Sequence, residues 1–117
     1  MLENEILKAY ENLSVATIDA FHAGEKAITA KNILERHKLA GLADGTIEGK
    51  NTDLREAAAR IVLEVEYANA EATDDDARLT RHDLDLARIE VERVRAMLRL
   101  HELRVAQLAQ SGDTPPF

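Results

Sequence analysis

The chain has 117 residues, which is enough for one domain and too few for two. Aromatic residues make up only 3% and there are two prolines, which excludes collagen-like chains, Pro/Gly low-complexity chains and β-sandwiches. The formal net charge of -7 argues against a basic nucleic-acid wrapper, and the lack of cysteine excludes disulfides and thiol chemistry. We therefore expect a soluble, nearly all-helical protein.

Nothing in the sequence indicates membrane insertion or export. No apolar run approaches the roughly 18 residues that a membrane span needs. The first residues, 1–5, are acidic where a secretory signal would be basic. We expect a cytoplasmic protein without a membrane partner.

The first predicted element is one long helix over about 2–43, a stretch filled with Ala, Leu, Glu and Lys. Apolar or small residues recur there with a 4-3-4-3 spacing, which places them on one coiled-coil stripe. The stripe consists of Leu2, Ile6, Ala9, Leu13, Ala16, Ala20, Ala23, Ala27, Ala30 and Leu34. A flanking set, Leu7, Tyr10, Phe21 and Ile28, is expected to widen this apolar face. Gly24 inside the pattern predicts close packing or a slight bend.

Glycines then mark a turn over residues 44–51. Gly45 lies just after the first helix, where helices commonly end. Gly49 is expected to adopt a backbone conformation that other residues avoid. Asn51 or Thr52 is expected to cap the second helix, because their side chains accept hydrogen bonds from its first N–H groups.

The second predicted helix runs from about 52 to 110, a stretch without proline or glycine. Thr73, followed by three aspartates, offers an alternative N-cap, so the chain forms three helices if it breaks there. We favour a continuous helix. Residues 111–117 are predicted to be a flexible tail, and the fold class is all-α, a long antiparallel helical hairpin over a single domain of residues 1–110.

The C-terminal half of this helix carries two stripes with coiled-coil spacing. The first seam consists of Leu84, Ala87, Val91, Val94, Leu98, His101, Val105 and Leu108. The second seam consists of Leu79, His82, Leu86, Ile89, Arg93, Ala96, Leu100 and Leu103. The two are offset by two residues, or about 200° around a helix, so they lie on opposite faces.

A helix with two opposite apolar faces needs two partners, and the first helix supplies one. The second partner is then another copy of the chain, which predicts a dimer or higher oligomer assembled as a bundle. Ten residues form the predicted interface: Leu84, Ala87, Val91, Val94, Leu98, Val105, Leu86, Ile89, Leu100 and Leu103. A monomer of three helices would weaken this inference.

The chain shows no phosphate loop, dinucleotide fingerprint, nucleophile elbow or zinc-finger spacing. Asp19 and His22 could share a metal, but helical di-metal bundles use two such pairs and this chain has one. We expect no enzyme activity, no cofactor and no resident metal.

The turn segment Gly45 to Ala57 contains Ile-x-Gly-Lys-Asn at 47–51, then Arg55 and a small residue. In this it resembles small uncharacterised phage and prophage proteins that are predicted helical hairpins. The resemblance implies a phage-related accessory protein in the host cell cytoplasm. It brings no catalytic residues with it.

The sequence thus favours a non-catalytic, self-associating interaction or scaffold protein. One alternative is an accessory factor for nucleic-acid processing, which would use Arg88, Arg95, Arg99 and Arg104 on the C-terminal helix. A third hypothesis is a Mg²⁺-dependent all-α nucleotide pyrophosphohydrolase. Its ligands would be two acidic pairs, namely Asp53 with Glu56 and Glu71 with Asp74.

Overall fold

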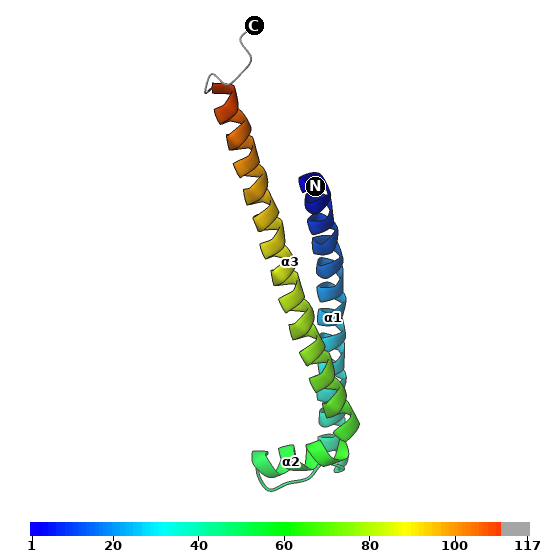
Figure 1. Cartoon of the computed structure of the whole chain (residues 1–117). Coiled ribbons are helices and arrows are strands. Elements are labelled where there is room, and N and C mark those ends of the chain that lie inside the picture. Colours follow the sequence, from blue (N-terminus) through cyan, green and yellow to red (C-terminus); the bar gives the residue numbers. More distant parts are fainter. Residues whose placement is uncertain (111–117) are drawn as a thin grey trace. The chain divides into compact units, whose positions relative to one another are not determined.

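The computed structural model describes residues 1–110, and over these residues the chain is an all-α helical hairpin (Figure 1). Its elements are α1 (Leu2–Asp44), α2 (Thr52–Val62) and α3 (Glu64–Gln110), and residues 1–110 contain no strand. None of these helices is long and apolar enough to cross a membrane. The tail expected over 111–117 lies outside the described residues.

The hairpin contains two compact units, each built from an antiparallel pairing of α1 with α3. Unit 1 comprises residues 1–17 together with the part of α3 that begins at His82. Unit 2 comprises residues 18–81 and therefore holds the turn and α2. Each unit has its own buried apolar cluster within the described residues.

Helix α1 follows the sequence prediction closely, since it ends one residue after the expected boundary. Every member of its 4-3-4-3 stripe is buried or half-buried, and Ala9, Ala23, Ala30 and Leu34 are fully buried. The flanking set was predicted wrongly. Leu7, Tyr10, Phe21 and Ile28 remain exposed, because the stripe alone is wide enough to pack against one neighbouring helix.

The predicted continuous second helix is interrupted at Leu63, which separates α2 from α3. Leu63 has φ -109° and ψ 36°, yet its N–H still donates to the Ala59 carbonyl at 2.8 Å and its carbonyl accepts from the Tyr67 N–H at 2.9 Å. Helical hydrogen bonding thus continues through a bend. Leu63 itself is buried, and beyond the bend α2 runs crosswise to α1 and α3 and projects to one side (Figure 1). The chain changes direction where the Leu63 side chain is packed, and neither proline nor glycine lies at the bend.

The break that we considered near Thr73 does not occur, because α3 is continuous from Glu64 to Gln110. The Thr73 hydroxyl donates to the carbonyl of Asn69 at 2.8 Å and to that of Ala70 at 3.1 Å. Its hydrogen-bonding capacity is therefore used inside the helix instead of at a cap.

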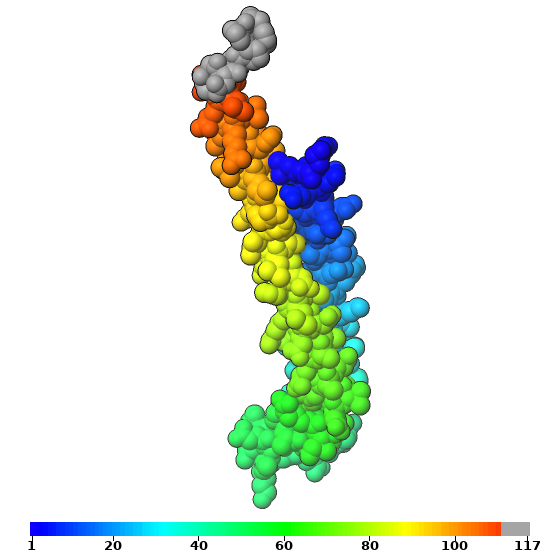
Figure 2. Space-filling model, in the orientation of Figure 1, coloured from blue at the N-terminus to red at the C-terminus, as the bar shows by residue number. Residues whose placement is uncertain are grey.

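Unit 2 closes around a cluster formed by Leu34 of α1, Ile47 of the turn, Ala59 of α2 and Leu63 at the bend. Tyr67 and two alanines pack against it. The side chains of the turn, of α2 and of the first part of α3 form one packed surface in Figure 2, where they are drawn in green. The turn residue Ile47 thus belongs to the core although it lies outside any helix.

The turn glycines play roles that differ from the prediction in one respect. Gly45 follows α1 with φ 83°, as expected for a residue that ends a helix. Gly49 does not have a positive φ, so the conformation that we predicted for it was wrong. A side chain is excluded there for a steric reason, because an added Cβ would lie 2.6 Å from the Arg55 nitrogen.

Two other local predictions have clear outcomes. Asn51 is the N-cap of α2, where its side-chain oxygen accepts the Leu54 N–H at 2.9 Å, and Thr52 is the first helical residue. Gly24 is not closely packed, since an added Cβ would meet nothing within 4 Å.

Candidate interaction surface

The first seam of α3 lies largely inside the chain. Val91 and Val94 form the buried cluster of unit 1 together with Ala9 of α1, and Ile6 and Leu13 pack against them. Leu84 is also buried, and Ala87 and Leu98 are half-buried. The seam becomes exposed toward the end of α3, where Val105 is 53% exposed. Intramolecular packing therefore already uses most of the first seam.

The second seam is exposed, and most of it lies on the side of α3 away from the buried cluster of unit 1, whereas Leu100 lines a concavity with Leu2 and Glu5 of α1. Its large apolar members keep more than half of their surface accessible: Leu86 51%, Ile89 61%, Leu100 58% and Leu103 55%. Ala96, His82 and Leu79 are exposed as well. A row of large exposed apolar side chains at coiled-coil spacing is typical of a helix that packs against another helix.

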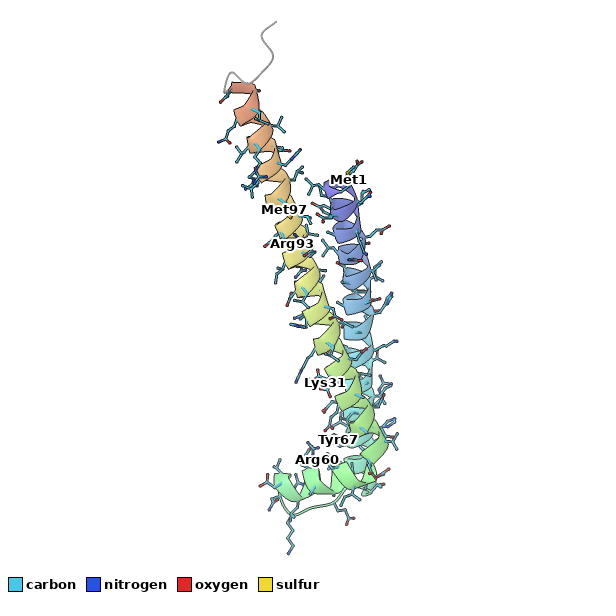
Figure 3. The ribbon with its side chains drawn as sticks, viewed as in Figure 1. Met1, Lys31, Arg60, Tyr67, Arg93 and Met97 are labelled. Carbon is cyan, nitrogen blue, oxygen red and sulfur yellow. The ribbon has the colours of Figure 1, made fainter. Side chains whose placement is uncertain are left out.

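Arg93 interrupts the second seam, but hydrogen bonds hold its guanidinium beside Glu90 and Met97 (Figure 3). Its guanidinium donates to Glu90 at 2.6 and 2.9 Å and to the Met97 sulfur at 2.8 Å. The hydrogen bond between the two charged groups lowers the pKa of Glu90 and raises that of Arg93. Only the aliphatic stem of Arg93 therefore crosses the seam.

Unit 2 contains a polar network that joins all three helices. Glu56 of α2 accepts hydrogen bonds from the Lys38 ammonium of α1 at 2.9 Å and from the Tyr67 hydroxyl of α3 at 2.6 Å. These hydrogen bonds lower the pKa of Glu56, and the bond to Glu56 raises the pKa of Lys38. Burial raises the pKa of Tyr67. The network fixes the position of α2 against its two neighbours.

The bend brings together the two acidic pairs of the hydrolase hypothesis only in part. Arg60 lies 3.9 Å from Glu56 and 3.8 Å from Glu71, and its guanidinium stacks 4.8 Å from the Tyr67 ring centre (Figure 3). Asp74 pairs separately with Arg78 at 2.9 Å. The carboxylates are thus engaged by arginine, and Asp53 is exposed in the first turn of α2.

The concave regions of unit 2 do not add a reactive cluster. Asp19 and His22 line an open groove of about 730 Å³, and within residues 1–110 no group of three or more His, Asp or Glu residues could hold a metal ion. A smaller cavity of about 180 Å³ lies beside the polar network. Its lining includes Lys38, Leu42, Ile47, Thr52, Arg55 and Glu56.

The four arginines of the nucleic-acid alternative do not share one face. At about 100° per residue, Arg88, Arg95 and Arg99 lie on one side of α3, and Arg104 lies beyond the second seam. Arg88 also pairs with Asp85 at 3.6 Å. The arrangement gives a continuous phosphate-binding stripe less support than the sequence alone suggested.

The network of Lys38, Glu56 and Tyr67 was not predicted from the sequence. Its only local signal was the i, i+11 spacing of Glu56 and Tyr67, which brings two residues to one helical face. The contribution of Lys38 depends on how the hairpin closes and could not be predicted locally. No protein-family model matches the chain, and neither a curated protein nor a solved structure matches it.

Proposed function

We propose that this chain is a non-catalytic helical interaction protein that self-associates through the second seam of α3. The observation that carries the proposal is the contrast between the two faces of one helix. One face holds Val91 and Val94 in the core of unit 1, and the other presents Leu86, Ile89 and Leu100 to solvent. Covering those side chains would stabilise an assembly by about 25 cal/mol for each Å² of apolar surface removed from water.

The setting that we propose is a phage-related accessory or scaffold role in the host cytoplasm, on the basis of the resemblance at residues 45–57. A row of exposed apolar side chains along one helix suits a protein that binds other proteins. The proposal needs no chemistry from the acidic pairs, in which Glu56 and Glu71 lie near Arg60 and Asp74 pairs with Arg78.

The test is the solution mass by light scattering over a concentration series. One chain has a mass of 13.0 kDa, and we expect twice this value or more for the wild type. The double variant Ile89→Glu with Leu100→Glu is expected to shift the mass to that of a single chain, because it places charges in the interface.

A matched control carries the same two charges elsewhere. Ile61 and Val65 are 78% and 77% exposed and lie outside the second seam, so Ile61→Glu with Val65→Glu is expected to leave the mass unchanged. A wild-type mass near 13.0 kDa at every concentration would contradict the proposal. Val94 is unsuitable for this test, because it is 0% exposed and a charge there would disrupt the fold of unit 1.

A further inference from the structure

The charges beside the second seam are divided along α3. In coiled-coil geometry the residues that flank such a seam contact the flanking residues of the partner helix. In unit 1, where this part of α3 begins at His82, four acidic residues flank the first half of the seam: Asp83, Asp85, Glu90 and Glu92. Two arginines, Arg99 and Arg104, flank its second half. All of these residues belong to unit 1, so the division is a property of one compact body.

A parallel, in-register pairing of two copies would be opposed by this charge pattern. Each seam residue then meets its own counterpart, so Arg93 faces a second Arg93. The flanking contacts of a parallel pair join residues five apart. They would place Asp85 beside Glu90 and Arg99 beside Arg104, both of which are like-charge contacts.

An antiparallel pairing that places Leu86 opposite Leu103 of the second copy removes these conflicts. Ile89 then faces Leu100, and the stem of Arg93 faces the small side chain of Ala96. The flanking contacts become opposite in charge, with Glu92 beside Arg99 and Asp83 beside Arg104, and each contact occurs twice in the symmetric dimer.

We infer that the second seam of α3 binds the same seam of a second copy in antiparallel orientation, with Leu86 opposite Leu103. The inference rests on the proposed self-association and adds its orientation and register. The pairing leaves the core of unit 1 intact, because Val91 and Val94 occupy the opposite face of α3. The hydrogen bonds between Arg93 and Glu90 neutralise the one charge that the seam itself carries.

Cysteine cross-linking tests the orientation directly, because the wild-type chain has no cysteine. We would mix the single variants Leu86→Cys and Leu103→Cys in equal amounts under mild oxidation and identify disulfide-linked pairs by mass. An antiparallel dimer gives mainly the mixed disulfide. Two copies of position 86 lie roughly 26 Å apart along the helix in this register, so neither variant alone is expected to cross-link.

A control pair of positions lies almost level in the proposed antiparallel register, as Leu86 and Leu103 do, but lies outside the seam. Arg88→Cys mixed with Glu102→Cys is expected to give no preferred mixed product. Efficient cross-linking of each seam variant with itself would show a parallel dimer and overturn the inference while leaving self-association standing. A wild-type chain that is monomeric by light scattering would instead refute the proposed function. Dimers that cross-link in neither way would overturn the inference by excluding this seam.

Charge reversal gives a second test, because it is expected to change the dissociation constant in opposite directions for the two orientations. In the antiparallel dimer Arg99→Glu turns two attractive contacts with Glu92 into repulsive ones, and we expect the dissociation constant to rise about tenfold at low salt. Adding Glu92→Arg is expected to restore it to within about threefold. In a parallel dimer Arg99→Glu would relieve the repulsion by Arg104, so tighter binding would overturn the inference.

Discussion

In unit 2 the apolar cluster draws on four stretches of chain, whereas in unit 1 it draws on two. Leu34, Ile47, Ala59 and Leu63 come from α1, the turn, α2 and the bend. In unit 1 the helices α1 and α3 meet through a small cluster centred on Val94. Two packed helices cover one face of each other and leave the opposite faces exposed. Unit 2 gains a third helix through the bend at Leu63, and for unit 1 we propose that a second copy supplies it.

The polar contacts also differ between the two units: Glu56 joins different helices in unit 2, whereas the pair of Arg93 and Glu90 lies within one helix in unit 1. In unit 2 the carboxylate of Glu56 is held by Lys38 and Tyr67, which belong to two other helices. In unit 1 Arg93 forms an ion pair at 2.6 Å with Glu90 of the same helix. The first kind of contact fixes tertiary structure, and the second leaves the surface of α3 available for another chain. We therefore expect stability to concentrate in unit 2 and recognition in unit 1.

The largest effect that tests this comparison is expected for Ile47→Ala. Ile47 is 3% exposed, and removing most of its side chain is expected to lower the free energy of unfolding by about 2–5 kcal/mol. Urea unfolding gives the size of the effect, and amide hydrogen exchange gives its place. We expect exchange to accelerate more over residues 18–81 than over residues 1–17 and 82–110.

Val94→Ala is the counterpart in unit 1 and removes fewer atoms. It is expected to cost less, about 1–3 kcal/mol, and to accelerate exchange mainly in residues 1–17 and 82–110. Equal acceleration over the whole chain in both variants would show that the two units do not differ in the way proposed.

Effects of similar or smaller size are expected at two glycines of unit 2, where the substitutions to alanine change the stability in opposite directions. Gly49→Ala places a Cβ 2.6 Å from the Arg55 nitrogen and 2.8 Å from the Leu54 carbonyl carbon, and we expect a loss of about 1–3 kcal/mol. Gly24→Ala meets nothing within 4 Å in a helix interior, so it is expected to gain up to about 1 kcal/mol. Melting temperatures of the two variants check both signs, and a stabilising Gly49→Ala would show that the turn relaxes easily.

The sequence predicts the helices of this chain far better than it predicts their bend. The bounds of α1 follow from an uninterrupted 4-3-4-3 stripe and from Gly45, which are both local features. Leu63 is a strong helix former with no proline or glycine beside it, so no local preference indicates a bend there. The bend accompanies burial of Leu63 against Leu34 and Ile47, which are distant in sequence.

The second seam and the polar network also differ in how far they could be predicted from the sequence. The second seam is a repeat along one helix, so it could be predicted in full from the spacing of Leu86, Ile89 and Leu100. The network of Lys38, Glu56 and Tyr67 forms only after α2 has turned away from α3, and the sequence could not place these residues together. Interaction surfaces on single helices are thus more visible in a sequence than contacts made by tertiary structure.

The smallest effect, and the one that isolates the polar network, is the pH dependence of Glu56→Gln. Hydrogen bonds from Tyr67 and Lys38 lower the pKa of Glu56 below its ordinary value of 4.5. A carboxylate whose pKa is lower in the folded state stabilises that state above its unfolded pKa, and this stabilisation is lost as the pH falls through the folded value. Because Glu56 is 42% exposed, we expect the variant to lose less than about 1 kcal/mol at pH 7.

The diagnostic quantity is the difference in unfolding free energy between the wild type and Glu56→Gln, measured by urea unfolding at pH 7 and at about pH 3. This difference is expected to shrink in acid, because the stabilisation by the wild-type carboxylate is lost as the pH falls through the lowered pKa of Glu56 in the folded state. Glu71→Gln is a matched control, since Glu71 is 71% exposed and lies 3.8 Å from Arg60, and it is expected to change stability less. A difference for Glu56→Gln that stays constant between the two pH values would mean that the carboxylate charge does not hold α2 against Lys38 and Tyr67.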